Sequence, residues 1–419
     1  MDKVVIDAAR HRAFSIPLDE VDVSDPKLFQ DNTVGHYFER LRRDEPVHYC
    51  KDSRFGPYWS VTKYKDIMQV EVNHQIYSSD AFKGGITINE RPMQYRRASF
   101  IAMDPPKHDD QRRTVSPIVA PANLALLEGT IRERTCKVLD ELPRNETFNW
   151  VDKVSIELTT LMLATIFDFP LEDRKLLTYW SDVATADLTA GGPIDSDEKR
   201  TAELMKCLAY FTRLWNERVN EPPRNDLISM MAHSPATRNM EPREFLGNLV
   251  LLIVGGNDTT RNSMSGGLHA MMTNPREWQK LRDNPALIAS LVPEIIRWQT
   301  PLAHMRRTAL KDTTLGGKPI RKGDKVVMWY LSGNRDEEAI EQADRFIVDR
   351  ARPRQHISFG FGVHRCVGNR LAELQLKVLW EEILVRFPRI EVVGEPVRTK
   401  SNFVHGFTEM KAVIPTRLS

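Results

Sequence analysis

The stretch Phe359-Gly360-Phe361-Gly362-Val363-His364-Arg365-Cys366-Val367-Gly368 is the most chemically specific segment of this chain of 419 residues. It ends a glycine-rich loop with a cysteine and leads into a segment whose apolar residues recur at helical spacing, at Leu371, Leu374, Val378, Ile383 and Leu384. The start of a helix favours negative charge, because unpaired backbone N–H groups and the helix dipole point there. The sequence therefore predicts a thiolate at Cys366.

The glycines of this loop indicate a tight turn. Gly360, Gly362 and Gly368 lack a Cβ and can adopt positive φ, so the chain can turn beneath a flat macrocycle without steric conflict. A free cysteine is more often a small buried apolar residue. Here the glycines, the aromatic ring of Phe359 and a His-Arg pair stand at fixed offsets from the cysteine, and this combination favours a thiolate loop for haem iron.

The loop resembles the haem-binding loop of the cytochrome P-450 family, because it matches the pattern Phe-Gly-x-Gly-x-His-Arg-Cys-x-Gly at every defined position. The resemblance implies haem b (iron protoporphyrin IX) as cofactor, with Cys366 as the ligand of the iron. It also implies that the loop binds the cofactor through Phe359, Gly360, His364, Cys366 and Gly368. A thiolate ligand favours O–O cleavage, so we expect an enzyme, a haem-thiolate monooxygenase that activates O2.

The same resemblance implies the cytochrome P-450 fold, mainly α with small β-sheets, in which haem is buried between a long central helix and the cysteine-loop helix. The residues agree with a mainly α chain. Amphipathic segments separated by prolines occupy about 110–300, and β-rich edge segments lie near 45–65 and 310–330. We expect a single domain over 1–419, with the haem-thiolate loop at 359–368.

A long helical pattern over 242–274 contains a cluster of poor helix formers, Gly255-Gly256-Asn257-Asp258-Thr259-Thr260. Each glycine costs a helix up to about 1 kcal/mol relative to alanine, so stability does not explain the cluster. The cluster resembles the oxygen-binding pattern of the family, Ala/Gly-Gly-x-Asp/Glu-Thr-Thr.

This second resemblance implies that Gly255 and Gly256 let the helix pass close to haem. It implies catalytic roles for Asp258 and Thr259, an acid and an alcohol that relay protons to oxygen. The alternative is a kinked helix in which Thr259 only bonds to a backbone carbonyl.

Haem propionates are carboxylates, and they need cationic or hydrogen-bonding partners. His108 and Arg112 lie one helical turn apart and resemble the His-x-x-x-Arg pair of the family. Arg307 and His364 match two further anchors. Solvated surface charge is the alternative for each of the four.

An acid and a base three residues apart, Glu294 and Arg297, resemble the Glu-x-x-Arg pair of the family, and we expect Arg345 to complete a buried charge cluster with them. Pro293 directly before the acid makes the length of this helix hard to predict, because proline removes a helical hydrogen bond.

Composition excludes several classes of function. The chain has 59 basic and 57 acidic residues, a net charge of +2, which argues against nucleic-acid binding by bulk electrostatics. The four cysteines are scattered without zinc or disulfide spacing. The N-terminal residues lack the apolar stretch of a signal peptide, and the longest apolar run, 249–254, is too short to span a bilayer. We therefore expect a cytoplasmic protein with no membrane span.

Only resemblance indicates the substrate. From Met103-Asp104-Pro105-Pro106-Lys107-His108 to Leu371-Ala372-Glu373-Leu374-Gln375-Leu376, the chain is similar to the soluble bacterial subfamily of terminal alkane and fatty-acid hydroxylases. This similarity implies oxygen insertion at the terminal (omega) carbon of linear medium-chain substrates. His304 matches a stretch that often borders the haem pocket, where a polar ring favours an oxygenated substrate. A structural histidine is the equal alternative.

Electrons must come from a separate donor, because the chain contains no flavin domain and no iron-sulfur cysteine pattern. Resemblance implies a ferredoxin with a flavin-dependent ferredoxin reductase. An acidic partner would be steered by basic residues near the predicted thiolate, namely Arg113, Arg352, Arg354, Arg365 and Arg370.

Three alternatives stay open. The same chemistry can act on a terpenoid or a steroid. The scaffold can also serve a peroxide-driven peroxygenase, which has no need of the Asp258 and Thr259 pair. A haem sensor that binds without catalysis is the third.

Overall fold

The computed structural model describes residues 3–188 and 193–416. The chain divides into two compact units. Unit 1 comprises Met1–Pro92, Gly266–Cys366 and Gly394–Met410, and unit 2 comprises Met93–Ser265, Val367–Val393 and Lys411–Ser419. The single domain expected from the sequence stays a prediction.

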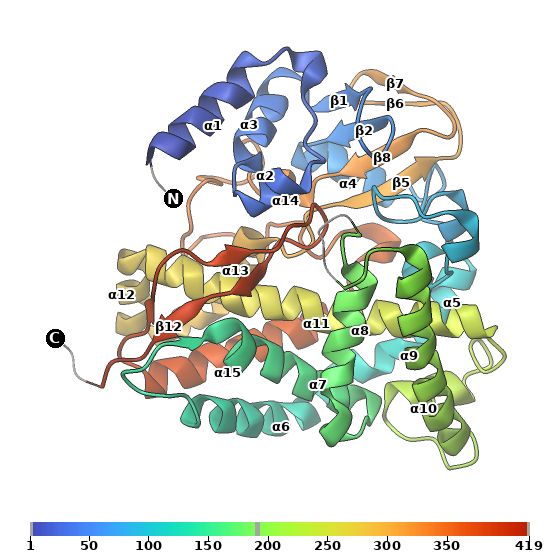
Figure 1. The fold of residues 1–419 in the computed structure, drawn as a ribbon, viewed down its shortest axis with the longest axis vertical. Helices are drawn as coiled ribbons and strands as arrows, with labels where there is room; N and C mark the ends of the chain where they lie inside the picture. Colours follow the sequence, from blue (N-terminus) through green and yellow to red (C-terminus); the bar gives the residue numbers. More distant parts are fainter. Residues whose placement is uncertain (1–2, 189–192, 417–419) are drawn as a thin grey trace. The chain divides into compact units, whose positions relative to one another are not determined.

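Unit 1 is built on a five-stranded sheet (Figure 1). In sheet order its strands are β1 (Val47–Cys50), β2 (Tyr58–Val61), β8 (Lys325–Met328), β5 (Met305–Ala309) and β3 (Tyr77–Ser78). β2 and β8 pair in parallel, and the other neighbours are antiparallel. Valine, tyrosine and tryptophan dominate β1, β2 and β8, as the residues near 45–65 and 310–330 predicted.

Two hairpins and a set of helices complete unit 1. The hairpins are β6 (Thr313–Leu315) with β7 (Lys318–Ile320), and β10 (Val397–Arg398) with β11 (Phe407–Glu409). The helices are α1 (Lys3–Ser15), α2 (Pro26–Gln30), α3 (Val34–Asp44), α4 (Tyr64–Val72), α12 (Pro275–Asp283), α13 (Ile288–Gln299) and α14 (Tyr330–Gly333). The buried ring of Trp329 packs on Phe29 and Phe38, with ring centroids 5.8 and 5.4 Å away, and joins α2 and α3 to the end of β8.

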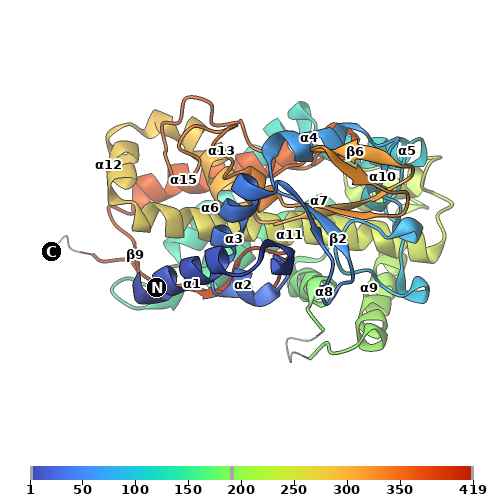
Figure 2. The same ribbon diagram turned by 90° about the horizontal axis from the view of Figure 1, so that it is seen from above.

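Unit 2 is mainly helical. Its helices are α5 (Lys107–Val115), α6 (Pro121–Asp140), α7 (Glu157–Phe167), α8 (Lys175–Thr185), α9 (Asp197–Arg218), α10 (Leu227–His233) and α15 (Asn369–Arg386). α8 and α9 lie side by side in both views (Figures 1 and 2). Phe167, Phe169, Trp180 and Phe211 form an aromatic core between α7, α8 and α9. A small sheet in the order β4 (Phe148–Asn149), β12 (Lys411–Val413), β9 (Glu391–Val392) closes the unit.

The long helix that the sequence predicted is α11 (Pro242–Thr273), and α12 begins at Pro275. Both prolines act as predicted, since proline fits the first turn of a helix but not its interior. Residues up to Ser265 of α11 belong to unit 2 and the rest belong to unit 1. Among the described residues, no helix combines the length and the apolar character that crossing a membrane requires.

The charge cluster of unit 1 differs from the prediction in its third member. Glu294 accepts hydrogen bonds from Nε of Arg297 at 2.8 Å and from Nε of Arg350 at 2.9 Å. Burial alone would raise the pKa of Glu294, but these bonds outweigh it and the pKa is lowered. Arg345, the predicted member, has an exposed side chain bound to Gln342, and contributes only a backbone carbonyl that accepts from Arg297 and Arg350.

Pro293 does not shorten the helix that carries this cluster, because α13 continues through it to Gln299. Its neighbour Glu294 therefore stands in the middle of a regular helix, where it meets Arg297 three residues later on the same face.

Arg350→Ala is expected to destabilise the fold by about 3 kcal/mol, because it removes a buried partner of a buried carboxylate. Arg345→Ala, the matched control, is expected to change stability by less than about 0.5 kcal/mol, because its side chain is exposed. Chemical denaturation of both variants checks this. Equal losses would show that the structure places the third arginine wrongly.

Candidate functional site

The cysteine loop of unit 1 turns through two glycines with positive φ. Gly360 has φ of 64° and Gly362 has φ of 65°, as predicted. A Cβ on Gly362 would lie 2.5 Å from the backbone oxygen of Glu71 in α4, so only glycine fits there. Gly368 differs from the prediction, because its φ is −88° and no atom lies within 4 Å of a Cβ built on it.

The cysteine itself ends this turn. The N–H of Cys366 donates to the carbonyl of Phe359 at 2.8 Å, and the N–H of Arg365 donates to the carbonyl of Gly362 at 3.2 Å. These bonds close the loop, and Cys366 is exposed three residues before α15 begins. His364 is half-buried in the same turn. An exposed thiol on a closed glycine turn fits the ligand that a haem iron requires.

A buried acid of α4, Glu71, which was not predicted from the sequence, lies against this loop. The carboxylate of Glu71 lies 2.9 Å from Nη2 of Arg307 and accepts a hydrogen bond from the hydroxyl of Tyr330. Burial, followed by the charge of Glu71, raises the pKa of Tyr330 well above its usual value, so the phenol stays protonated and donates. Arg307 therefore has a carboxylate partner within unit 1, and its contact with a propionate stays a prediction.

The glycines of the α11 motif serve different purposes. A Cβ on Gly256 would lie 2.6 Å from Cδ2 of Leu163, so this glycine lets α11 pack on α7. Gly255 is exposed and has no atom within 4 Å of its Cβ position. Of these two glycines, only Gly255 leaves the helix surface open for a ligand. Thr259 donates to the carbonyl of Gly255 at 2.7 Å, which is the bond of the kinked-helix alternative.

The acid of the motif is fully buried within unit 2. Asp258 lies 2.7 Å from Nη2 of Arg261, and Thr185 of α8 donates to its other oxygen at 3.4 Å. Arg261 also bonds to Asp182 of α8 at 2.8 Å. Burial raises the pKa of Asp258, and the charge of Arg261 opposes part of that rise. Arg261 was not predicted from the sequence, although its position three residues after Asp258 is the spacing of an ion pair on one helical face.

The two residues predicted on α5 lie on one face of that helix, as their spacing implied. His108 is buried, with Nδ1 at 2.7 Å from the carboxylate of Asp109, and Arg112 is half-buried. His108 and Arg112 belong to unit 2, while Arg307 and His364 belong to unit 1. Binding of propionates by these four residues stays a prediction.

His304 is a structural residue. It is fully buried, its Nδ1 lies 2.8 Å from the carbonyl of Asn402, and its Nε2 accepts from the N–H of Ile88 at 3.0 Å. Burial lowers its pKa to about 4, so the ring is neutral. Both ring nitrogens are occupied, which agrees with the structural alternative, and His304 therefore gives no support for an oxygenated substrate.

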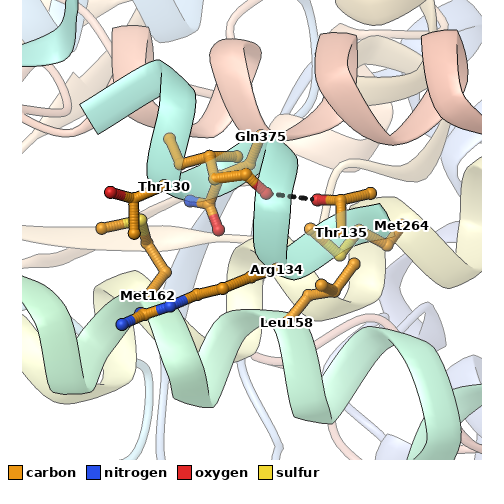
Figure 3. Close-up of a pocket in the computed structure, with 8 residues that line it drawn as sticks. Thr130, Arg134, Thr135, Leu158, Met162, Met264 and Gln375 are labelled. Atoms are coloured by element: carbon orange, nitrogen blue, oxygen red, sulfur yellow. Dashed lines mark hydrogen bonds between the residues drawn. The ribbon is translucent and has the colours of Figure 1, made fainter. Parts of the chain in front are cut away.

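A small cavity lies among α6, α7, α11 and α15 of unit 2 (Figure 3). Its volume is about 20 Å³, and residues such as Thr135, Met162 and Gln375 line it. That volume holds about one water molecule. It is too small for an organic substrate.

The basic residues predicted to steer a donor are exposed. Arg352, Arg354 and Arg365 lie in unit 1, and Arg113 and Arg370 lie in unit 2. Their exposure suits an electrostatic contact, and the contact itself stays a prediction.

Known proteins resemble this chain over nearly its whole length. The family model described as Cytochrome P450 matches residues 194–408. Linalool 8-monooxygenase of Pseudomonas putida is 36% identical over 414 residues, which cover 95% of this chain and 99% of the relative. Steroid C26-monooxygenase of Mycolicibacterium smegmatis is 31% identical over 406 residues, covering 94% and 93%.

Solved structures also resemble this chain over nearly its whole length. Cytochrome P450-153 from Novosphingobium aromaticivorans has a TM-score of 0.88 and 47% identity, over 94% of this chain and 99% of that one. CYP153D17 from Sphingomonas sp. PAMC 26605 has a TM-score of 0.90 and 50% identity, over 95% and 100%.

Gly362→Ala is expected to reduce the fraction of protein that binds haem through its thiolate. The added Cβ meets the carbonyl of Glu71 at a positive φ, a strain of about 1–3 kcal/mol. Gly368→Ala, with negative φ and open space, is the control and is expected to load normally. The red-shifted Soret band of the reduced carbon monoxide complex measures loading. Normal loading of Gly362→Ala would contradict the role assigned to this contact.

Proposed function

The chain belongs to the cytochrome P450 family of haem-thiolate monooxygenases, and on that premise we propose that it hydroxylates linear medium-chain fatty acids or alkanes, preferentially at the terminal (omega) carbon. The observation that carries the substrate proposal is an apolar stripe on α11, formed by the half-buried Leu251 and Val254, which ends at the exposed Gly255. The stripe agrees with the similarity of the sequence to terminal hydroxylases.

The cofactor of the proposal is haem b, held by Cys366 as iron ligand and by His108, Arg112, Arg307 and His364 at the propionates. When bound, it supplies the oxygen-activating chemistry of the family. Within unit 1, Glu71 holds Arg307 in place while Gly362 keeps the cysteine loop on α4. These contacts set the position of the thiol before the cofactor binds.

Asp258 and Thr259 are the proposed proton carriers. The raised pKa of Asp258 makes its carboxylate easier to protonate than a surface aspartate, which suits a group that passes protons. Arg261 connects this acid to Asp182, whose side chain is half exposed to solvent. The hydroxyl of Thr259 donates to the backbone carbonyl of Gly255, which is exposed on the surface of the helix.

The apolar residues of α11 before Gly255 differ in how deeply they are buried. Leu249 and Ile253 are fully buried in the core of unit 2. Leu251 and Val254 pack against the same core but remain half-buried. These half-buried side chains provide an apolar surface for a hydrocarbon chain next to Gly255. A terminal C–H bond is stronger than its internal neighbours, so terminal hydroxylation needs a site that presents only the methyl group.

The second candidate is a terpenoid or steroid substrate, because relatives named for linalool and steroid oxidation match the chain. Those relatives are 36% and 31% identical, below the 47% and 50% of the two P450-153 structures, whose names state no substrate. For electron transfer we propose a separate donor protein, because the sequence contains no flavin or iron-sulfur motif. The resemblance to bacterial terminal hydroxylases favours a ferredoxin, reduced by a flavin-dependent reductase, as that donor.

A spectral titration with linear acids, alkanes, cyclic terpenes and steroids tests the substrate proposal. Linear ligands are expected to change the spin state of the haem, and product analysis is expected to find oxygen at the terminal carbon. A response to cyclic ligands alone would transfer the proposal to the second candidate.

Thr259→Ala is expected to uncouple oxygen consumption from product formation, because the hydroxyl beside Gly255 is lost while the fold is kept. Oxygen uptake and product are measured together, with an added donor system. Coupling equal to that of the wild type would remove Thr259 from the mechanism, and product formed only with peroxide would support a peroxygenase.

A further inference from the structure

Arg97 is a half-buried cation in the segment before the short turn at Phe100–Ala102. Within residues 3–188 and 193–416 it makes no hydrogen bond and no ion pair. Burial, followed by the charge of Arg200, lowers its pKa to about 10, so it is still charged at neutral pH. Burying part of a guanidinium without a hydrogen-bonding or acidic partner costs free energy, unless a ligand supplies that partner.

The surroundings of Arg97 carry an excess of positive charge. The charged side chains that act on it are those of Arg200, Arg243 and Asp197. Asp197 is already bound to Nη1 of Arg200 at 2.8 Å, and Arg200 also donates to the carbonyls of Val183 and Ala186. The carboxylate of Asp197 is therefore already paired with Arg200, and the remaining positive charge of the cluster favours the binding of an added anion.

The segment that carries this arginine lies directly on α11. A Cβ on Gly247 would lie 1.9 Å from the carbonyl oxygen of Ala98 and 3.5 Å from Cβ of Arg97. Gly247 therefore permits the close approach that holds the arginine against this helix.

From that point the apolar stripe runs toward the catalytic motif. Leu251 and Val254 follow Gly247 by four and seven residues, which puts them on the same side of the helix. Gly255 comes eight residues after Gly247, a rise of about 12 Å. A medium-length acyl chain can bridge that distance.

We propose that Arg97 binds the carboxylate of the substrate and makes this enzyme select fatty acids over alkanes. The inference rests on the proposed function and narrows it. Arginine presents paired N–H donors that match a carboxylate. With the carboxylate at Arg97, the chain lies along Leu251 and Val254, and its terminal methyl reaches Gly255 and Thr259. Selection of the omega carbon then follows from anchoring the opposite end.

The test compares dodecanoate with methyl dodecanoate, which has the same chain without the charge. Spectral titrations give the Kd of each for the wild type, Arg97→Gln, Arg97→Lys and Arg238→Gln. Arg238 is an exposed arginine just before α11 and serves as the control. Only protein that forms the thiolate-type carbon monoxide complex is counted, so a folding defect is not mistaken for weak binding.

The wild type is expected to prefer the acid. Arg97→Gln is expected to reduce the ratio of ester to acid Kd about tenfold or more, since a hydrogen-bonded charge is lost. Arg97→Lys is expected to recover part of that ratio, and Arg238→Gln to keep it.

Two failures are distinguishable. If the wild type hydroxylates both ligands at the terminal carbon but Arg97→Gln keeps the wild-type Kd ratio, the role of Arg97 is overturned and the proposed function stands. If the wild type neither binds nor oxidises dodecanoate, methyl dodecanoate or the alkane dodecane, the proposed function is overturned, and the role of Arg97 with it.

Discussion

The approach of Gly362 to the backbone oxygen of Glu71 is the contact on which the cysteine loop depends. It requires a residue without a Cβ at positive φ, and it brings the loop against α4. The same helix then carries the carboxylate that binds Arg307 and Tyr330. One short helix thus determines both the turn before Cys366 and the position of an arginine predicted to bind the cofactor. The hydrogen bond from the N–H of Cys366 to the carbonyl of Phe359 closes this loop.

Three buried or half-buried ionic groups show how the fold treats charge. Glu294 is fully compensated by two arginines, and its pKa is lowered despite burial. Asp258 has one strong partner, and its pKa is raised. Arg97 has no partner among the described residues. A buried charge that is fully paired with opposite charges suits a structural cluster, and one that is only partly paired suits a proton carrier. The uncompensated cation indicates a place for a ligand, because burial without a partner is costly.

The elements with strong local patterns were predictable. The limits of α11 follow from two prolines, and β1, β2 and β8 follow from runs of valine and aromatic residues. The strands that the sequence did not reveal, such as β4, β9 and β10, have two residues each, too few to show an alternating pattern. Glu71 could not be recognised either, since an acid in a helix is usually exposed. Arg261 had a local signal, its spacing from Asp258, that was overlooked.

The sequence by itself determined the cysteine loop, its turning glycines Gly360 and Gly362, and the motif on α11, because these depend on residues that are close together in the chain. Only the tertiary structure decided which arginine completes the Glu294 cluster, that both nitrogens of His304 are occupied, that Gly256 serves the packing of α7, and that Arg97 lacks a partner within residues 3–188 and 193–416. Each of these facts depends on a neighbour supplied by a distant segment. Burial and pairing are properties of the packed chain, and local composition carries no record of which distant residue will be the neighbour.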